Sequence, residues 1–211
     1  MNKDLFRTYQ TACLVGPMLP LLGETLDQFE GNSVITTYAP ELRPSSPWRK
    51  QIVEGWTIIS VDLWKPHNVR CILDREGNVN LYGPGGTPDR TYQIPDAGVM
   101  REGAGDYGYV NRIRAIGDGL YVCGQSRQVY RFVPGKPHVL DGQWVDFAGT
   151  MRQQPMSEPP DDNGGEAFER WLDENDAIDL VDIAGSSESA VSYKHLTQLT
   201  ILNVLITVVT G

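Results

Sequence analysis

The sequence predicts a mainly β fold made of antiparallel four-stranded blades, a partial β-propeller with one short helical acidic insertion. The first observation is a repeat: residues 69–74 resemble residues 113–118 at an offset of 44, and each run is followed by a strand-like run that ends in Gly, 79–83 and 120–124. This offset lies within the period of roughly 40 to 50 residues that four-stranded blades show. The second observation is that the runs are short, rich in β-branched residues and separated by Asp- and Gly-containing turns, which favours strands over helices.

The N-terminal region, residues 1–32, is expected to be a mixed or helical segment. Leu22, Leu26 and Phe29 recur there at helical spacing. The apolar run 12–23 contains two prolines and is too short to span a membrane. We interpret the run as part of a packed N-terminal element, and the alternative is the core of a signal peptide.

Residues 33–150 are expected to form two to three propeller-like blades. The strand-like runs 33–38 and 56–61 indicate an early, degenerate blade. In the later blade, residues 128–133 alternate with period two, and a further run at 143–147 follows an Asp-Gly turn. Trp144 lies in that last run, and we expect it to pack inside the blades.

Negative charge is concentrated in one segment of the chain. The sequence has 18 Lys and Arg against 27 Asp and Glu, a net charge of -9, and residues 151–190 contain eleven acids and two bases. This charge repels phosphate groups, so we expect no nucleic acid partner. We interpret residues 151–179 as an insertion between blades. It holds a short amphipathic helix, because four apolar residues follow helical spacing: Ala167, Phe168, Trp171 and Leu172.

The C-terminal residues divide into two parts. Residues 180–190 are expected to start a further blade, since LVDIAG at 180–185 continues the repeat. Residues 191–211 depart from the pattern and form an anomalous tail that resembles translated sequencing-adapter read-through, in which case the natural protein continues past residue 190. The alternative is a genuine strand, because residues 201–209 are rich in β-branched side chains.

A family resemblance supports the fold. The stretch IRAIGDGLYVCGQSRQVYRFVPGKPHVLDGQWVDFAG, which begins at Ile113, and LVDIAGSSESAV, which begins at Leu180, resemble bacterial β-propeller repeats in the style of WD and kelch blades. The resemblance covers about 35 residues well and implies a ligand- or protein-binding platform, although several enzymes use this architecture.

Motifs for catalysis, metals or cofactors are weak throughout the sequence. Residues 103–108 match G-x-G-x-x-G, but a strand follows where a dinucleotide site needs a helix. Asp74, Asn78 and Asn80 suggest a turn between strands rather than a calcium loop. The three histidines are isolated and the three cysteines form no metal-binding spacing. We therefore predict no catalytic residues, no metal and no cofactor.

The remaining candidates are binding residues. Tyr107 and Tyr109 lie in a glycine-rich loop, and Asp161, Asp162 and Glu166 lie in the acidic insertion. They predict a non-enzymatic binding or scaffolding module with a protein partner, basic in character, and no membrane contact. Three unpaired cysteines favour a cytoplasmic location. Open strand edges would also permit self-association.

Two alternatives to a binding module remain open. One is a propeller-type hydrolase or lyase acting on carbohydrates through blade-tip carboxylates, for which Asp74 and Asp118 are the repeat-related candidates. The other is a truncated product without intact function, because closed propellers need 4 to 8 blades.

Overall fold

The structure is a computed structural model, and it describes most of the 211 residues. The described ranges are 7–13, 19–25, 32–38, 40, 44–83, 89–151, 160, 165–174, 179–187, 190–196 and 203–206. The fold is mainly β, as the sequence predicts. Within the described residues, no helix has the length and apolar character needed to cross a membrane.

In the described part of the chain, fifteen strands form four antiparallel sheets in which consecutive strands are neighbours. The first sheet contains β1 (Arg7–Ala12), β2 (Leu19–Thr25), β3 (Ser33–Tyr38) and β4 (Trp48–Val53). The second contains β5 (Ile58–Trp64), β6 (Val69–Asp74), β7 (Asn78–Tyr82) and β8 (Arg90–Gln93). The third contains β9 (Val110–Ile116), β10 (Gly119–Gly124), β11 (Val129–Val133) and β12 (Gln143–Asp146). The fourth contains β13 (Asp179–Ser187), β14 (Ala190–Leu196) and β15 (Asn203–Ile206).

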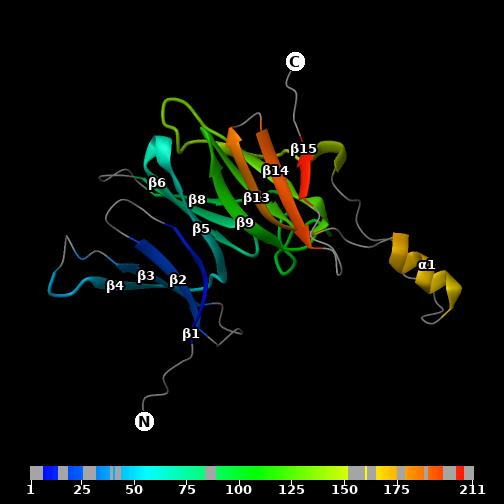
Figure 1. The fold of residues 1–211 in the computed structure, drawn as a ribbon, viewed down its shortest axis with the longest axis horizontal. Helices are drawn as coiled ribbons and strands as arrows, with labels where there is room; N and C mark the ends of the chain where they lie inside the picture. Colours follow the sequence, from blue (N-terminus) through cyan, green and yellow to red (C-terminus); the bar gives the residue numbers. More distant parts are fainter. Residues whose placement is uncertain are drawn as a thin grey trace, which may run out of the picture.

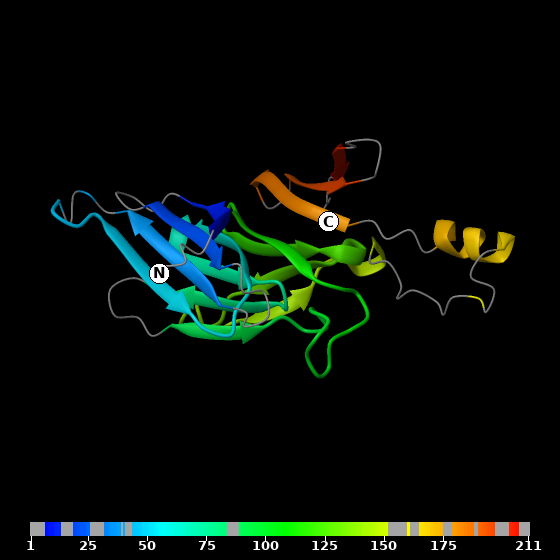
Figure 2. The same cartoon turned by 90° about the horizontal axis from the view of Figure 1, so that it is seen from below.

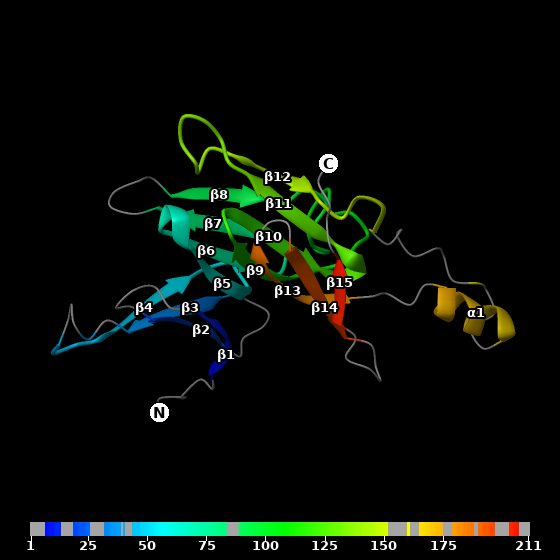
Figure 3. The same ribbon diagram turned by 45° about the horizontal axis from the view of Figure 1, so that its top comes forward.

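Short helical elements occupy some of the connections. Three are 3-10 turns, at Lys65–His67, Gln125–Arg127 and Gly149–Met151. The α-helix α1 (Glu166–Glu174) lies in the acidic insertion, where the sequence predicts a short helix. Figures 1 and 3 show α1 apart from the sheets, beyond the fourth one.

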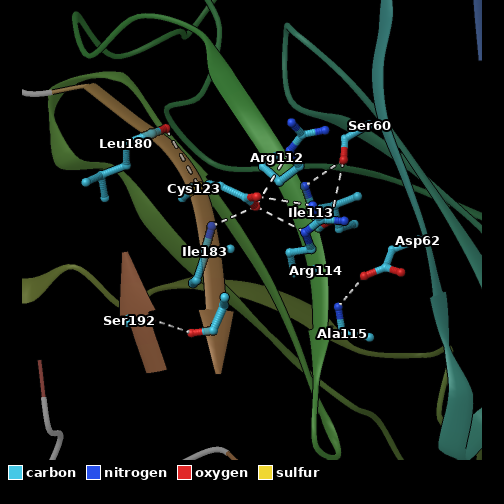
Figure 4. Close-up of polar contacts among 12 residues, drawn as sticks. Ser60, Asp62, Arg112, Ile113, Arg114, Ala115, Cys123, Leu180, Ile183 and Ser192 are labelled. Atoms are coloured by element: carbon cyan, nitrogen blue, oxygen red, sulfur yellow. Dashed lines mark hydrogen bonds and ion pairs between the residues drawn. The ribbon is translucent and has the colours of Figure 1, made fainter. Parts of the chain in front are cut away.

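The first strands of successive sheets lie side by side and run in the same direction. Ser60 on β5 exchanges hydrogen bonds with the backbone of Ile113 on β9: the Ile113 amide donates to Ser60 Oγ at 3.1 Å, and Ser60 Oγ donates to the Ile113 carbonyl. Two residues further along both strands, the Ala115 amide donates to Asp62 Oδ2 at 2.9 Å (Figure 4). Side chains of one blade thus form hydrogen bonds with the backbone amide and carbonyl groups along the first strand of the next blade.

An ion pair joins the third and fourth sheets in the same manner. Arg114 on β9 donates from Nε and Nη2 to the two carboxylate oxygens of Asp182 on β13, at 3.1 and 3.2 Å. Asn111 Nδ2 donates to the Leu180 carbonyl at 2.9 Å. Because the inner strands meet in parallel while each sheet is an antiparallel meander, the sheets are arranged as the blades of a partial propeller.

Apolar side chains fill the spaces between blades. The largest cluster lies between the second and third sheets and includes Trp64, Phe132 and Trp144. Trp144 is 5% exposed, and its ring centroid lies 5.4 Å from that of Phe132, so it packs inside the blades as expected. Buried and half-buried residues alternate along β7, which is the pattern of a strand with one face in the core.

Two expectations from the sequence differ from the structure. In the described part of the region 1–32, β1 and β2 are strands rather than a mixed or helical segment, because β2 pairs with β1 and, from Leu19 to Glu24, with β3. The repeat is also shifted by one strand: residues 69–74 form the second strand of a blade, whereas 113–116 lie in a first strand. Equivalent strands β5 and β9 begin 52 residues apart, at Ile58 and Val110. Each blade contains several short β-branched runs that end in turns. The second strand of one blade therefore resembles the first strand of the next, and an alignment shifted by one strand also gives a sequence match.

The tail begins within β14. Residues 190–196 and 203–206 form β14 and β15, which pair antiparallel in the order β13, β14, β15. The remainder of 197–211 lies outside the described residues.

Candidate functional site

The candidate site lies at one end of the sheets, which we call the loop face. It consists of the connections β6–β7 (75–77), β8–β9 (94–109), β10–β11 (125–128) and β12–β13 (147–178). These connections emerge at the same end because the sheets are meanders whose inner strands run parallel. Tyr107 and Tyr109 lie in the second of them, and Asp161, Asp162 and Glu166 lie in the fourth.

The β8–β9 connection, which we call the Gly-Tyr loop, folds back on itself. Asp96 bridges to Ala104, and Gly98 bridges to Gly108. The Gly105 amide donates to the Asp96 carbonyl at 2.9 Å. Residues 99–103 therefore form a projecting tip, seen as the green loop at the bottom of Figure 2.

The second sheet holds one side of this loop. The Val99 and Met100 amides donate to Glu76 Oε2, at 2.9 and 3.0 Å. The Arg75 guanidinium lies over the Tyr109 ring, 5.0 Å from its centroid. Gly98 has a φ of +94°, and a Cβ there would lie 2.7 Å from the Glu76 carbonyl oxygen, so the close approach requires glycine.

The third sheet holds the other side through two glutamines. Gln128 is fully buried; its Nε2 donates to the carbonyls of Tyr107 and Gly108, at 3.0 and 3.1 Å. The Tyr130 hydroxyl donates to Gln128 Oε1 at 2.9 Å. The Tyr109 amide donates to Gln125 Oε1 at 2.7 Å. The backbone on both sides of the tip is thus fixed by side chains of two neighbouring blades.

The surface of the Gly-Tyr loop combines apolar and acidic side chains. Val99 is 50% exposed and Met100 is 79% exposed, both at the tip. Exposed carboxylates flank them along the loop: Asp96, Glu102 and Asp106. Tyr107 and Tyr109 are half-buried, so each presents part of its ring. The loop therefore offers a small apolar surface beside these three carboxylates and beside Arg101, whose guanidinium donates to the Ala97 and Ile94 carbonyls.

The acidic insertion enters the same face of the propeller. Glu166 is exposed at the start of α1, whereas Asp161 and Asp162 lie outside the described residues. The views in Figures 1 and 2 agree that α1 stands away from the Gly-Tyr loop. The structure therefore brings Tyr107 and Tyr109 together in one loop and places Glu166 elsewhere.

Asp74 is a buried carboxyl at the edge of the loop face, 2% exposed at the end of β6. It accepts hydrogen bonds from the Asn78 amide and from Asn78 Nδ2, both at 2.7 Å. This is the turn that the sequence suggests for Asp74 and Asn78. Burial raises the pKa of Asp74 from 3.8 to about 6, although both bonds to Asn78 oppose the rise.

The raised pKa of Asp74 gives a pH-dependent stability. The folded state binds the Asp74 proton more tightly than the unfolded state does. The free energy of unfolding therefore increases as the pH falls through about 6, and it stops increasing below pH 3.8, the ordinary pKa of the group. We expect the Asp74 contribution to rise by about 1 kcal/mol from about pH 7 to about pH 5. The difference between wild type and Asp74→Asn in urea denaturation at the two pH values measures it. An identical pH dependence of the two proteins would contradict the assignment.

The carboxylates considered for carbohydrate chemistry do not converge. Asp74 ends β6 at the loop face, whereas Asp118 lies in the β9–β10 turn at the opposite end of the sheets. The shifted repeat explains why the two positions were expected to be equivalent. Among the described residues, no three His, Cys, Asp or Glu side chains are grouped so that they could hold a metal ion. Strand β9 follows residues 103–108, so the loop lacks the helix of a dinucleotide site.

A separate small cleft lies between the first and second sheets. Its polar lining includes Cys13, Asp62, Arg70 and Cys71. Burial raises the pKa of Cys13 to about 12 and also raises that of Cys71. Both thiols are protonated at neutral pH, and a protonated thiol is a poor nucleophile.

Sequence reasoning missed the residues that position the Gly-Tyr loop. Gln125, Gln128 and Glu76 carry no local pattern that marks a long-range role. Val99 and Met100 did carry a signal, because they are an adjacent apolar pair within a segment rich in Gly, Pro and Asp. Such a pair in a turn-rich connection has no strand or helix face to pack on.

Comparisons with known proteins give likenesses to solved structures and no match to a sequence family. No family model matches the sequence, and no curated protein matches it. The chain is similar to the crystal structure of Sqt1 from Saccharomyces cerevisiae, at a TM-score of 0.48 and 12% sequence identity. The match covers 91% of this chain and 58% of the Sqt1 chain, so this chain spans less than two thirds of that protein.

Proposed function

We propose that the chain is a non-enzymatic binding module whose loop face holds a basic protein segment. The observation that carries this proposal is the tip of the Gly-Tyr loop, where Val99 and Met100 are exposed while hydrogen bonds from two blades fix the backbone behind them. A loop already held in one conformation loses little conformational entropy when a partner binds. Loops on a rigid scaffold are the common location of binding residues.

The charges around the tip indicate the chemistry of the partner. Asp96, Glu102 and Asp106 are exposed beside the apolar pair, so a matching segment carries Lys or Arg next to one or two apolar side chains. Tyr109 lies against Arg75 in the same way as an Arg of the partner can lie on an aromatic ring of this face.

The acidic insertion has a second role in this proposal. Its excess of carboxylates, with Asp161, Asp162 and Glu166 among them, extends the negative potential of the loop face and attracts a basic partner from a distance. Neutralising these three residues is therefore expected to slow association more than it speeds dissociation.

A pair of defined peptides tests the proposal. The probe is a fluorescent peptide of about ten residues that alternates Lys with Leu, and its counterpart replaces each Lys with Glu. We expect the full chain to bind the Lys peptide, with an affinity that falls as salt increases. Met100→Ser removes apolar contact without changing charge and is expected to weaken binding about 5- to 10-fold. Fluorescence anisotropy measures both.

Val133→Ser is the matched control for this experiment. Val133 is also exposed, at 41%, but it ends β11 at the opposite end of the sheets. Its substitution is expected to leave the affinity unchanged. Equal binding of the two peptides, or equal losses for Met100→Ser and Val133→Ser, would show that the loop face is not the binding surface.

A further inference from the structure

The sulfur-containing side chains in the described part of the chain differ widely in their exposure to solvent. Cys71 and Cys123 are fully buried, and Cys13 is half-buried. Met151 is half-buried against the core cluster between the third and fourth sheets. Met100, at the tip of the Gly-Tyr loop, is 79% exposed. Of these five side chains, Met100 is therefore the most open to a reagent in solution.

The three thiols are poor targets for an oxidant. A thiol reacts with peroxide as the thiolate. Burial raises the pKa of Cys13 to about 12, and it also raises the pKa of Cys71 and of Cys123. All three are therefore protonated at neutral pH. A thioether has no proton to lose, so the reactivity of a methionine depends on access to its side chain.

The backbone at Met100 is fixed although the side chain is exposed. The Val99 and Met100 amides both donate to Glu76 Oε2, at 2.9 and 3.0 Å. Arg101, the next residue, donates from its guanidinium to two carbonyls within the Gly-Tyr loop. Carrying Met100 into the core would break these hydrogen bonds, so its side chain stays in solvent in the free protein.

A peroxide converts an accessible methionine into its sulfoxide. A lone pair of the thioether sulfur attacks one peroxide oxygen, and the O–O bond breaks. The departing hydroxide takes the proton of the transferred hydroxyl, which leaves the sulfoxide and water. Sulfur is oxidised by two electrons and the peroxide is reduced by two. The product carries a polar S–O group where the side chain was apolar.

The surroundings of Met100 do not compensate for the new oxygen. The two amides beside the side chain, those of Val99 and Met100, already donate to Glu76. The exposed side chains of Glu102 and Asp106 are carboxylates, which accept hydrogen bonds rather than donate them. A partner whose apolar side chain packs on this position would cover a polar oxygen, and burial of an unpaired polar group is unfavourable.

We propose that Met100 is an oxidation site through which a peroxide releases the partner of the loop face. This inference rests on the proposed function, because it requires Met100 to contact the partner. The reduced thioether supplies apolar contact area, and the sulfoxide removes it. The fold is expected to remain intact, since Met100 is exposed rather than packed in the core.

Limited treatment of the full chain with hydrogen peroxide tests the reactivity. Trypsin separates the two described methionines, because residues 91–101 and 132–152 form different peptides with one Met in each. Tandem mass spectrometry is expected to show sulfoxide forming at Met100 at least about 5-fold faster than at Met151. Equal rates at the two positions would overturn the inference, whether or not any peptide binds to the loop face.

Titration with the fluorescent Lys peptide tests the consequence of oxidation. The sulfoxide at Met100 is expected to weaken binding about 10-fold, and treatment with methionine sulfoxide reductases should restore the affinity. Met100→Leu keeps an apolar side chain that peroxide does not convert, so it should bind like wild type before and after treatment. Met151→Leu is the matched control, and it should lose affinity on oxidation as wild type does.

The two proposals fail in different ways in this titration. If the untreated chain bound the Lys peptide no better than its Glu counterpart, the proposed function would be wrong, and the oxidation rate at Met100 would still be measured. If the untreated chain bound the Lys peptide and the oxidised chain bound it equally well, the inference would be wrong. An equal loss of affinity in oxidised Met100→Leu and oxidised wild type would overturn it as well. Circular dichroism shows whether the oxidised chain is folded.

Discussion

Replacing Trp64 with alanine is expected to lower the free energy of unfolding by about 3–5 kcal/mol. The Trp64 side chain is fully buried between the second and third sheets. Its ring meets the Phe132 ring edge to face, at a centroid distance of 5.9 Å and an angle of 90°. Truncation therefore leaves a cavity in the largest core cluster. Urea denaturation followed by circular dichroism measures the loss.

Two variants serve as controls for this prediction. Trp64→Phe keeps most of the ring volume but loses the hydrogen bond from Nε1 to the Asp118 carbonyl, which is 2.9 Å long; we expect a loss of about 1–2 kcal/mol. Trp48→Ala removes the same side chain from an exposed position and should cost about 1 kcal/mol or less. Equal losses for Trp64→Ala and Trp48→Ala would contradict the packing described here.

Replacing Gln128 with alanine is expected to cost about 2–3 kcal/mol of stability and to weaken peptide binding at the loop face. Gln128 is a buried amide that donates to the Tyr107 and Gly108 carbonyls and accepts from the Tyr130 hydroxyl. Alanine supplies neither donor nor acceptor, so the Gly-Tyr loop loses its attachment to the third sheet. Urea denaturation and the Lys peptide titration measure the two effects.

Tyr130→Phe separates the two effects of Gln128. This substitution removes the hydroxyl that donates a hydrogen bond to Gln128 Oε1, but it keeps the hydrogen bonds from Gln128 to the Gly-Tyr loop. We expect a loss of about 1 kcal/mol with peptide affinity close to wild type. If Gln128→Ala lowered stability while leaving peptide affinity unchanged, the loop would not depend on Gln128 for its binding conformation.

Several features of this fold follow from local sequence patterns. The strand at Ser33–Tyr38 was predicted at its observed bounds, since β-branched residues favour strands wherever they are packed. The buried position of Trp144 and the short helix around Phe168 follow from period-two and helical spacing. The glycine-rich loop was placed between strands because a strand-like run follows it.

Other features depended on tertiary contacts. Strand β2 exists because it pairs with β3, although it contains Leu22, one of the three residues that the sequence places at helical spacing. The true repeat register is set by inter-blade bonds such as that of Ser60 with Ile113, which join residues 53 positions apart. Because the blades repeat in this register, Asp74 and Asp118 occupy different positions in their blades and lie at opposite ends of the sheets.

The candidate site shows the same division between sequence and structure. Tyr107, Tyr109 and the acidic insertion were singled out from composition, because glycine-rich and acidic segments can be recognised without knowledge of their neighbours, whereas the loop acids Asp96, Glu102 and Asp106 were not singled out. The rigidity of the Gly-Tyr loop could not be predicted from the sequence. Glu76, Gln125 and Gln128 come from two different blades, and they form hydrogen bonds with the loop only after the sheets assemble. Local spacing determines which residues can form a strand or a turn, whereas long-range hydrogen bonds and packing determine where that turn is held.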